Sequence, residues 1–212
     1  MKGFSLLVVL FALAAVFIAA LLLGGPGDGA DPVVLVAFRN PELIPAARLL
    51  THLGDWWTAL AAAALGGAAL IHQGRVRAAA LLIGIIVSEK AVVELLKWEL
   101  DRARPDPTGR MVAVHNMAFP SGHSANSMTI WLALALLAAP ARYRGAAVGG
   151  AVAIALVTGI CRLILQVHWP SDVIGGWAFG LFWVLLLVRL LGQDPSRSAE
   201  AGPPGGPPYR RS

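Results

Sequence analysis

Cysteine and charge are what this 212-residue sequence largely lacks. Cys161 is its only cysteine, so no disulfide can form within the chain, and cysteine usage gives no information about the redox compartment. Charged residues make up 14% of the chain, against about 25% in a typical soluble domain. The hydrophobic fraction is 57% and the mean hydropathy is +0.69. This composition excludes an ordinary soluble domain and predicts an integral membrane protein.

The charge that is present is mostly basic, with a net charge of +5 and a pI of about 10.1. In a soluble protein such basicity can indicate nucleic-acid binding. Here the lysines and arginines lie mostly between apolar runs, where they act as signals of membrane topology. We therefore expect a membrane-embedded protein with no nucleic-acid partner.

Six runs approach the roughly 20 apolar residues that a membrane span needs. They are residues 4–23, 56–72, 77–97, 124–140, 146–166 and 173–191. The sequence thus predicts an all-α fold, a six-transmembrane-helix bundle in one domain over residues 1–194, with a disordered Pro/Gly-rich tail at 195–212. The first run could instead be a signal peptide, but its uncharged stretch exceeds the roughly 7–15 residues of a signal core. We therefore expect a span there.

The basic residues in short loops predict the orientation of the bundle. With six spans, one side of the membrane holds Lys2, Arg75, Arg77, Arg142, Arg144, Arg189, Arg197, Arg210 and Arg211. This side is predicted to be cytoplasmic and to carry both termini of a multi-pass protein of the plasma (inner) membrane. The opposite, outer side then holds residues 24–55, 98–123 and 167–172. Within it, residues 33–50 are apolar but broken by Pro41 and Pro45, and they are expected to lie along the interface.

Three polar clusters fall on this outer side. The first ends the third span and contains Lys97, Arg104 and Pro105; the second is PSGH at 120–123, which opens the fourth span. The third runs from the end of the fifth span to the start of the sixth and contains Arg162, His168 and Asp172. The orientation was derived from other loops, so the placement of all three clusters on one side of the membrane is an independent check on the predicted topology.

The residue types in these clusters are suited to phosphate. Lys97, Arg104 and Arg162 would repel one another unless an anion lay between them, and the planar guanidinium matches phosphate oxygens. Ser121 can cap the following helix and Gly122 lets backbone N–H groups approach a ligand, so that the helix start becomes an anion site. We expect these five residues to bind phosphate.

Two histidines can divide the work of breaking a phosphate ester. His168 is the expected nucleophile on phosphorus, and His123 the expected general acid for the departing oxygen. Asp172 can accept a proton from one ring nitrogen of His168 and leave the other free, although Pro170 lies between them. The cations and the helix end can neutralise the transition-state charge, so we expect no metal and no cofactor.

Taken together, the clusters resemble the signature of the type 2 phosphatidic acid phosphatase (PAP2) superfamily of membrane lipid phosphatases. The matching residues are Lys97-x6-Arg104-Pro105, Pro120-Ser121-Gly122-His123 and Arg162-x5-His168-x3-Asp172. The resemblance implies a phosphohistidine intermediate on His168, metal independence and, for bacterial members, a site on the outer leaflet. One position departs from the pattern, because Cys161 stands where the family has Ser.

Other polar residues leave alternatives open. Lys90, Glu94 and Lys97 share one stripe of the third span, where they either form a buried network that positions Lys97 or make interhelical ion pairs with no role in the chemistry. Glu89 is also costly in lipid. The acidic residues Asp28, Asp31 and Asp55 are interpreted as loop or cap residues, and no role is assigned to His52, His72 and His115.

The expected function is hydrolysis of a lipid phosphomonoester or diphosphate, with a polyprenyl diphosphate such as undecaprenyl diphosphate favoured by analogy. Phosphatidylglycerophosphate and phosphatidate remain alternative substrates, and transfer of the phosphoryl group to a lipid hydroxyl remains an alternative reaction. A non-enzymatic alternative is a transporter or channel with a basic vestibule. The sequence leaves the oligomeric state open.

Overall fold

The computed structural model describes residues 3–27, 29–114 and 116–191, and in this part of the chain all regular structure is helical. The helices are α1 Gly3–Leu23, α2 Ala30–Ala37, α3 Ile44–Leu50, α4 Trp56–His72, α5 Val76–Leu100, α6 Gly122–Leu137, α7 Arg144–Ile164 and α8 Pro170–Leu191. Short 3-10 turns lie at Pro41–Leu43, Thr51–Gly54, Pro107–Gly109 and Ala141–Tyr143. The predicted all-α class is confirmed. Lys2, His115, Arg197, Arg210, Arg211, Asp28 and the proposed tail at 195–212 lie outside the described residues.

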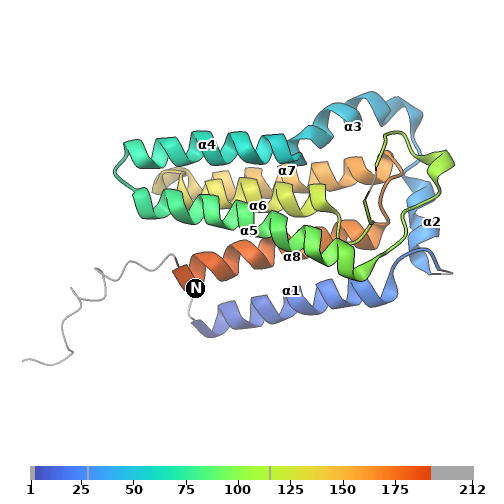
Figure 1. Cartoon of the computed structure of the whole chain (residues 1–212), viewed down its shortest axis with the longest axis horizontal. Coiled ribbons are helices and arrows are strands. Elements are labelled where there is room, and N and C mark those ends of the chain that lie inside the picture. Colours follow the sequence, from blue (N-terminus) through green and yellow to red (C-terminus); the bar gives the residue numbers. More distant parts are fainter. Residues whose placement is uncertain (1–2, 28, 115, 192–212) are drawn as a thin grey trace, which may run out of the picture.

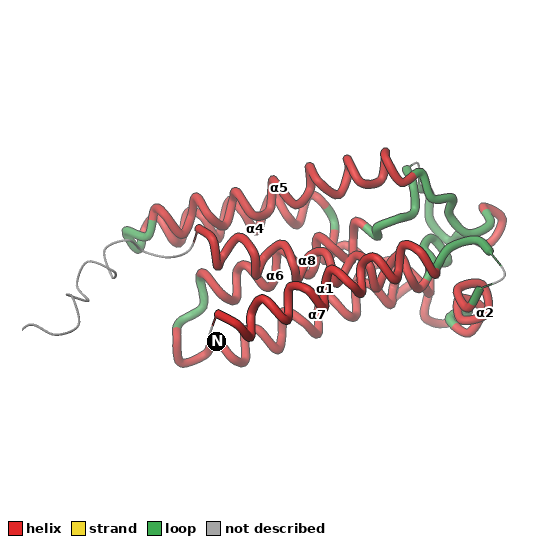
Figure 2. The backbone as a smooth tube through the Cα atoms, turned by 90° about the horizontal axis from the view of Figure 1, so that it is seen from below, coloured by secondary structure: helices red, strands yellow, loops and turns green. Residues whose placement is uncertain are grey.

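Six long helices coincide with the six predicted runs. They form an elongated bundle in which α2 lies crosswise at one end (Figures 1 and 2). Residues 33–50, expected along the interface, form the end of α2 and all of α3, and Asn40 and Pro41 separate the two helices. The helix predicted at 124–140 begins two residues earlier, because Ser121 stands at its N-cap position.

Among the described residues, three helices are long and apolar enough to cross a membrane by length and composition alone. They are Ser5–Leu23, Ala141–Ile164 and Pro170–Leu191. Helix α4 is apolar but has 17 residues, α6 has 16, and α5 carries several charges in its second half. Large apolar side chains such as Phe11, Leu65 and Trp98 are exposed on the outer surface of the bundle, as expected for helices that face lipid.

Helix α6 is the centre of the bundle and contacts α4, α5, α7 and α8. Helix α8 approaches it through Gly176 and Gly180, which stand in a G-x-x-x-G spacing typical of close helix contacts in membranes. A Cβ atom at Gly176 would lie 2.6 Å from the carbonyl oxygen of Ser121, and one at Gly180 would lie 2.6 Å from that of Ala125. Glycine at both positions therefore permits the two backbones to pack together.

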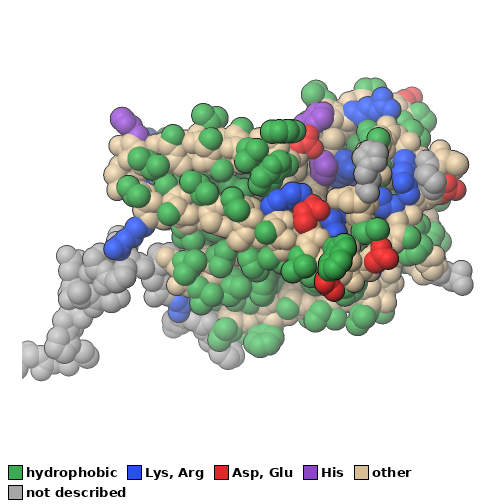
Figure 3. Space-filling view, in the orientation of Figure 1, with side chains coloured by type: hydrophobic (Ala, Val, Ile, Leu, Met, Phe, Trp, Pro, Cys, Tyr) green, Lys and Arg blue, Asp and Glu red, His purple; other side chains and the backbone are tan. Residues whose placement is uncertain are grey.

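The ends of four helices meet at the end of the bundle that carries α2 and α3 (Figure 1). Here α5 and α7 end and α6 and α8 begin, and all three predicted clusters lie at these ends. Charged side chains gather toward the same end in the space-filling view, whereas the rest of that face is mainly apolar (Figure 3). The antiparallel helices thus bring together segments that are far apart in the sequence.

Candidate active site

A cavity of about 330 Å³ opens among the converging helix ends. Six of the predicted site residues line it: Lys97, Arg104, Gly122, His123, Arg162 and His168. The remaining lining comes from Gly54, Asp55, Trp56, Trp57, Lys90, Glu94, Val114, Asn116 and Asn126. Ser121 and Asp172 are buried beside the cavity and do not line it. Residues that span 115 positions of the chain therefore share one basic cavity.

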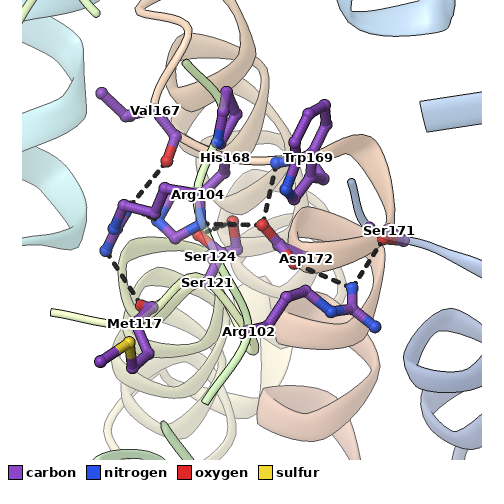
Figure 4. Close-up of polar contacts among 12 residues, drawn as sticks. Arg102, Arg104, Met117, Ser121, Ser124, Val167, His168, Trp169, Ser171 and Asp172 are labelled. Atoms are coloured by element: carbon purple, nitrogen blue, oxygen red, sulfur yellow. Dashed lines mark hydrogen bonds and ion pairs between the residues drawn. The ribbon is translucent and has the colours of Figure 1, made fainter. Parts of the chain in front are cut away.

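His168 stands in the turn between α7 and α8 with both ring nitrogens engaged. Its Nδ1 lies 3.3 Å from Oδ2 of Asp172, and its Nε2 lies 2.9 Å from a terminal nitrogen of Arg104 (Figure 4). A guanidinium can only donate hydrogen bonds, so Nε2 has to be the acceptor and Nδ1 carries the proton toward Asp172. Burial, together with the charges of Arg104 and Lys97, lowers the pKa of His168 well below its ordinary value. The ring is therefore neutral near pH 7, with its lone pair on Nε2.

Asp172 holds the start of α8 as well as the ring. Its Oδ2 accepts a hydrogen bond of 2.8 Å from the backbone N–H of Trp169, the residue before the helix. Asp172 is the third helical residue and Pro170 the first, so this is a capping-box contact behind a favourable N-terminal proline. Asp172 therefore contacts the His168 ring and caps the start of α8 with the same oxygen.

The sequence analysis missed Arg102, which contacts the other oxygen of the Asp172 carboxylate. Arg102 donates to Oδ1 of Asp172 at 3.0 Å and to the hydroxyl of Ser171 at 2.9 Å (Figure 4). Its guanidinium lies 4.3 Å from the centre of the Phe119 ring. Its other terminal nitrogen donates to the carbonyls of Ala20 and Leu21 at the end of α1. Because Arg102 belongs to none of the motifs, only packing reveals it.

Asp31, interpreted from the sequence as a loop or cap residue, extends this network. Its carboxylate accepts hydrogen bonds from the backbone and the hydroxyl of Ser171 and from the backbone N–H of Gly25. Together with Arg102, it ties α1 and α2 to the start of α8. The ends of three helices are thereby fixed around the carboxylate that holds His168.

The three predicted phosphate-binding cations are anchored by carbonyls and hydroxyls. Lys97 donates to the carbonyl of Met117 at 2.8 Å, and Arg162 to the hydroxyl of Thr51 at 3.1 Å. Arg104 bonds the carbonyls of Asn116, Met117 and Val167 as well as His168. Burial lowers the pKa of Arg104 to about 10, and Asp172 opposes the fall, so it stays cationic near neutral pH. Nε of Arg162 is buried without a hydrogen-bond partner among the described residues.

His123 enters the cavity from the first turn of α6 and meets a residue that the sequence analysis placed in no site. Its Nε2 lies 2.7 Å from Oδ1 of Asp55, the residue before α4. Oδ2 of the same carboxylate lies 2.6 Å from Nδ1 of His52. The hydrogen bond from His123, aided by that from His52, outweighs burial and lowers the pKa of Asp55 to about 2. Asp55 is therefore ionised and can only accept hydrogen bonds.

The expected roles of Ser121 and Gly122 are met in part. Ser121 stands at the N-cap position of α6, but its hydroxyl accepts from that of Ser124 at 3.0 Å and caps no backbone N–H. Its backbone N–H donates to the carbonyl of Asp172, which leaves no exposed donor there. The side-chain cap predicted for Ser121 is therefore wrong, because the hydroxyl is turned into the contact between α6 and α8. Gly122 lines the cavity as expected.

The stripe along α5 forms an ion pair separate from Lys97. Nζ of Lys90 lies 2.5 Å from Oε1 of Glu94, whereas Lys97 bonds Met117. The pair lies within α5 instead of between helices, and Lys97 is hydrogen-bonded to Met117 instead of to this pair, so the structure differs from both alternatives. Both members of the pair nevertheless line the cavity, on the side where Trp56 and Trp57 begin α4. Glu89 is buried, and neither carboxylate oxygen has a partner among the described residues.

Cys161 and His72 lie away from the cavity. The thiol is buried against Ala47, Ile164, Leu165 and Val167. His72 ends α4 at the opposite end of the bundle. Among the described residues no group of three His, Cys, Asp or Glu side chains is placed to hold a metal ion. The polar groups of the cavity are instead cations, imidazoles, single carboxylates and the amides of Asn116 and Asn126.

This arrangement is suited to phosphoryl transfer. Three cations and a helix N-terminus surround a space bordered by one neutral imidazole, whose lone pair faces the cations, and by a second imidazole held by a carboxylate. Residues 77–195 match the model of the PAP2 superfamily, which covers more than half of the chain. The chain belongs to the PAP2 superfamily. It is a membrane lipid phosphatase of this type, and six of its motif residues line one cavity.

The chain is also similar in sequence to individual lipid phosphatases. The chain is 27% identical to phosphatidylglycerophosphatase B of Bacillus subtilis over 165 residues, 76% of this chain and 81% of the relative. It is 34% identical to lipid A 1-phosphatase of Rhizobium etli over 143 residues, 62% of this chain and 58% of the relative. It is 31% identical to decaprenylphosphoryl-5-phosphoribose phosphatase of Mycobacterium tuberculosis over 160 residues, 71% of this chain and 84% of the relative.

A solved structure shares the fold. The crystal structure of a transmembrane PAP2 type phosphatidylglycerolphosphate phosphatase from Bacillus subtilis superposes with a TM-score of 0.69 at 27% identity, covering 88% of this chain and 94% of that one. The likeness to a transmembrane enzyme over most of both chains, together with the apolar helices, makes this PAP2 protein an integral membrane protein.

Proposed function

We propose that this PAP2 phosphatase releases the terminal phosphate of a lipid through a phosphohistidine on His168, with His123 as general acid and Asp172 as the residue that orients the nucleophile. The observation that carries the proposal is the pair of contacts on the His168 ring: Asp172 on Nδ1 and Arg104 on Nε2. They put the lone pair on the nitrogen that faces the cations. In this proposal Lys97, Arg104, Gly122 and Arg162 hold the phosphoryl oxygens, whereas Ser121 is buried beside the cavity at the start of α6.

In the first step, Nε2 of His168 attacks phosphorus while the bond from phosphorus to the lipid oxygen breaks. Arg104 moves its hydrogen bond from Nε2 to a phosphoryl oxygen, which frees the lone pair. His123 gives its proton to the lipid oxygen, and Asp172 stabilises the positive charge that grows on the His168 ring.

In the second step, water attacks the phosphorus of the phosphohistidine, and the bond between phosphorus and Nε2 breaks. His123, now neutral, takes a proton from the water and returns to its starting form, and inorganic phosphate leaves. Both steps use groups of this chain to neutralise the charge on the phosphoryl oxygens, so no metal ion is required in the proposal.

Within the lipid phosphates, we infer a substrate that carries a second phosphate toward its lipid side, with a polyprenyl diphosphate favoured. Lys90 supports this inference, because it adds a fourth cation to the cavity. It lies on α5 about two helical turns before Lys97, toward the N-terminus of the helix. The substrate names of two relatives, phosphatidylglycerophosphate and decaprenylphosphoryl-5-phosphoribose, also describe two-phosphate lipids. Phosphatidylglycerophosphate is the second candidate, and phosphatidate and lipid A 1-phosphate come after it.

The cavity also bears on two alternative activities, phosphotransfer and transport. A phosphotransferase would use a lipid hydroxyl in place of water in the second step, and labelled phosphate would then appear in lipid instead of in solution. A transporter with a basic vestibule would have no use for two histidines that are each held by a carboxylate. We therefore favour hydrolysis.

The membrane arrangement completes the proposal. We infer that α1, α4, α5, α6, α7 and α8 are six spans and that the cavity opens at the outer, periplasmic face with cytoplasmic termini. The support comes from Arg75, Arg77, Arg142 and Arg144, which lie in turns or helix starts at the end of the bundle opposite the cavity.

The nucleophile is tested with purified protein in detergent and a ³²P-labelled lipid diphosphate. His168→Ala is expected to abolish both phosphate release and acid-labile labelling of the protein, and His123→Ala to slow turnover by about 10²–10⁴-fold. His72→Ala, at the far end of α4, is the matched control and is expected to behave as wild type. Full activity in His168→Ala would overturn the proposal.

A further inference from the structure

The general-acid candidate His123 faces an electrostatic problem within the cavity. Its nearest charged and titratable neighbours from the surrounding elements are Lys97 on α5, Arg162 on α7, His168 before α8 and Asp55 before α4. A general acid has to carry an extra proton, and two of these neighbours are cations that disfavour an imidazolium. Asp55 is the carboxylate that can balance it, because the other carboxylate lining the cavity, Glu94, is paired with Lys90.

The contact is direct and well placed. Oδ1 of Asp55 lies 2.7 Å from Nε2 of His123, and the side chains are 26% and 28% exposed, so solvent screens the pair only in part. An ionised carboxylate accepts and does not donate, so Nε2 of His123 carries a hydrogen while the contact lasts. The other ring nitrogen, Nδ1, is then the one that gains and loses a proton.

The backbone around Asp55 is built to hold this position. Gly54 packs so closely on α6 that a Cβ atom there would lie 2.5 Å from the carbonyl oxygen of His123 and 2.8 Å from Cγ2 of Thr158. The carbonyl of Gly54 also accepts a hydrogen bond of 3.1 Å from the side chain of Asn126. Asp55 itself makes no side-chain cap on α4, although it stands at the N-cap position. Its carboxylate serves the two histidines instead.

We propose that Asp55 is a positioning residue for the general acid: it fixes Nε2–H of His123, so that Nδ1 delivers the proton to the leaving oxygen, and it balances the imidazolium charge. In the step, the bond between Nδ1 and hydrogen breaks as the O–H bond forms, and the electrons of the breaking P–O bond stay on the lipid oxygen. His52, whose side chain is 66% exposed, holds the second oxygen of Asp55 from the solvent side. This inference rests on the proposed function.

The site therefore contains two His–Asp pairs in which the carboxylate contacts a different ring nitrogen of each histidine. Asp172 engages Nδ1 of His168 and leaves Nε2 as the nucleophile, whereas Asp55 engages Nε2 of His123 and leaves Nδ1 as the acid. The two pairs come from different segments and assign one reactive nitrogen to each ring.

The test compares Asp55→Asn with wild type on two substrates, a lipid diphosphate and p-nitrophenyl phosphate. The nitrophenolate leaves without protonation, so a general-acid defect is expected to lower kcat at least tenfold on the lipid and less than threefold on the aryl ester. KM should change less than threefold. The alkaline limb of the kcat–pH profile is expected to move to lower pH, because an imidazolium without its carboxylate loses its proton more readily.

His52→Ala provides a second variant at an exposed side chain, with an expected two- to fivefold fall in kcat and a shift of the limb in the same direction. Glu42→Gln, which removes an exposed carboxylate outside the cavity, is the matched control and should leave both substrates unchanged. Equal losses on the two substrates with an unmoved pH profile would overturn the inference and indicate a merely structural Asp55. That outcome leaves the proposed function standing if His168→Ala is still inactive.

Discussion

The two histidines of the site differ in which ring nitrogen carries the hydrogen, because different groups contact them. Arg104 can only donate to Nε2 of His168, whereas Asp55 can only accept from Nε2 of His123. The lone pair therefore lies on opposite nitrogens of the two rings. The motif supplies two imidazoles, and in the proposed mechanism their immediate partners decide which one attacks phosphorus and which one protonates the leaving oxygen.

Lys90 is the residue on which the substrate proposal can be tested. Lys90→Gln should slow hydrolysis of undecaprenyl diphosphate and phosphatidylglycerophosphate by about 10–150-fold, the range that corresponds to a hydrogen bond of about 1.5–3 kcal/mol with a charged group. Phosphatidate, with a single phosphate, should be affected less than twofold. The measurement is phosphate release from each lipid in detergent at matched concentration.

Arg77→Gln is the control for Lys90→Gln, since it removes a cation near the start of α5, far from the cavity. An equal effect of Lys90→Gln on all three lipids would contradict a second-phosphate role. The partner of Lys90, Glu94, is 43% exposed, so the ion pair is screened and can open to a ligand.

At the scale of elements, the contact between α6 and α8 sets the distance between the two halves of the site. Helix α6 begins with Gly122 and His123, and α8 begins just after His168. Gly176 and Gly180 hold the helices close, and the backbone N–H of Ser121 donates to the carbonyl of Asp172 across the contact. A change in this packing would therefore move His123 relative to His168.

Gly180→Ala is expected to lower stability by about 1–3 kcal/mol through overpacking, because its Cβ atom would meet the backbone of Ala125. Gly84→Ala on α5 is a matched control with open space at the Cβ position, and there the higher helix propensity of alanine should leave stability unchanged or raised. Thermal unfolding of both variants in the same detergent measures the difference. A Gly180→Ala protein that melts at or above wild type would show that the contact is not tight.

At the scale of the whole molecule, the two ends of the bundle differ, because one holds the polar cavity and the other holds short turns with basic residues. The cavity, α2 and α3 lie at the first, and the turns that contain Arg75 and Arg142 lie at the second (Figure 1). A site at the outer face would meet lipids of that leaflet, with the phosphate at the surface and the chain beside the helices. The orientation therefore determines which pool of lipid the enzyme reaches.

Labelling from outside intact cells tests this orientation. Cys161→Ser gives a cysteine-free chain, and its activity is expected to be unchanged because the thiol packs against apolar side chains away from the cavity. Into it, Thr108→Cys places a thiol near the cavity and Gln73→Cys one at the other end. A membrane-impermeant maleimide should label the first directly and the second only after permeabilisation. The reverse pattern would contradict the outer-face proposal.

Much of the fold could be predicted because its causes are local. Runs of apolar residues give helices wherever lipid or a helical core surrounds them, and all six predicted runs are helical. His168 and Asp172 are close in the chain, and the first turn of α8 brings them to 3.3 Å. Ser121 shows the limit of such reasoning, since its hydroxyl bonds Ser124 instead of capping α6.

The sequence by itself determined the helical runs, the motif residues and the pairing of His168 with Asp172, because each depends on neighbours within a few residues. Only the tertiary structure decided that Asp55 meets His123 and that Arg102 meets Asp172, across 68 and 70 positions of the chain. Such partners depend on how the helices pack, which is set by the summed burial and close contacts of the whole bundle. No local spacing carries that information.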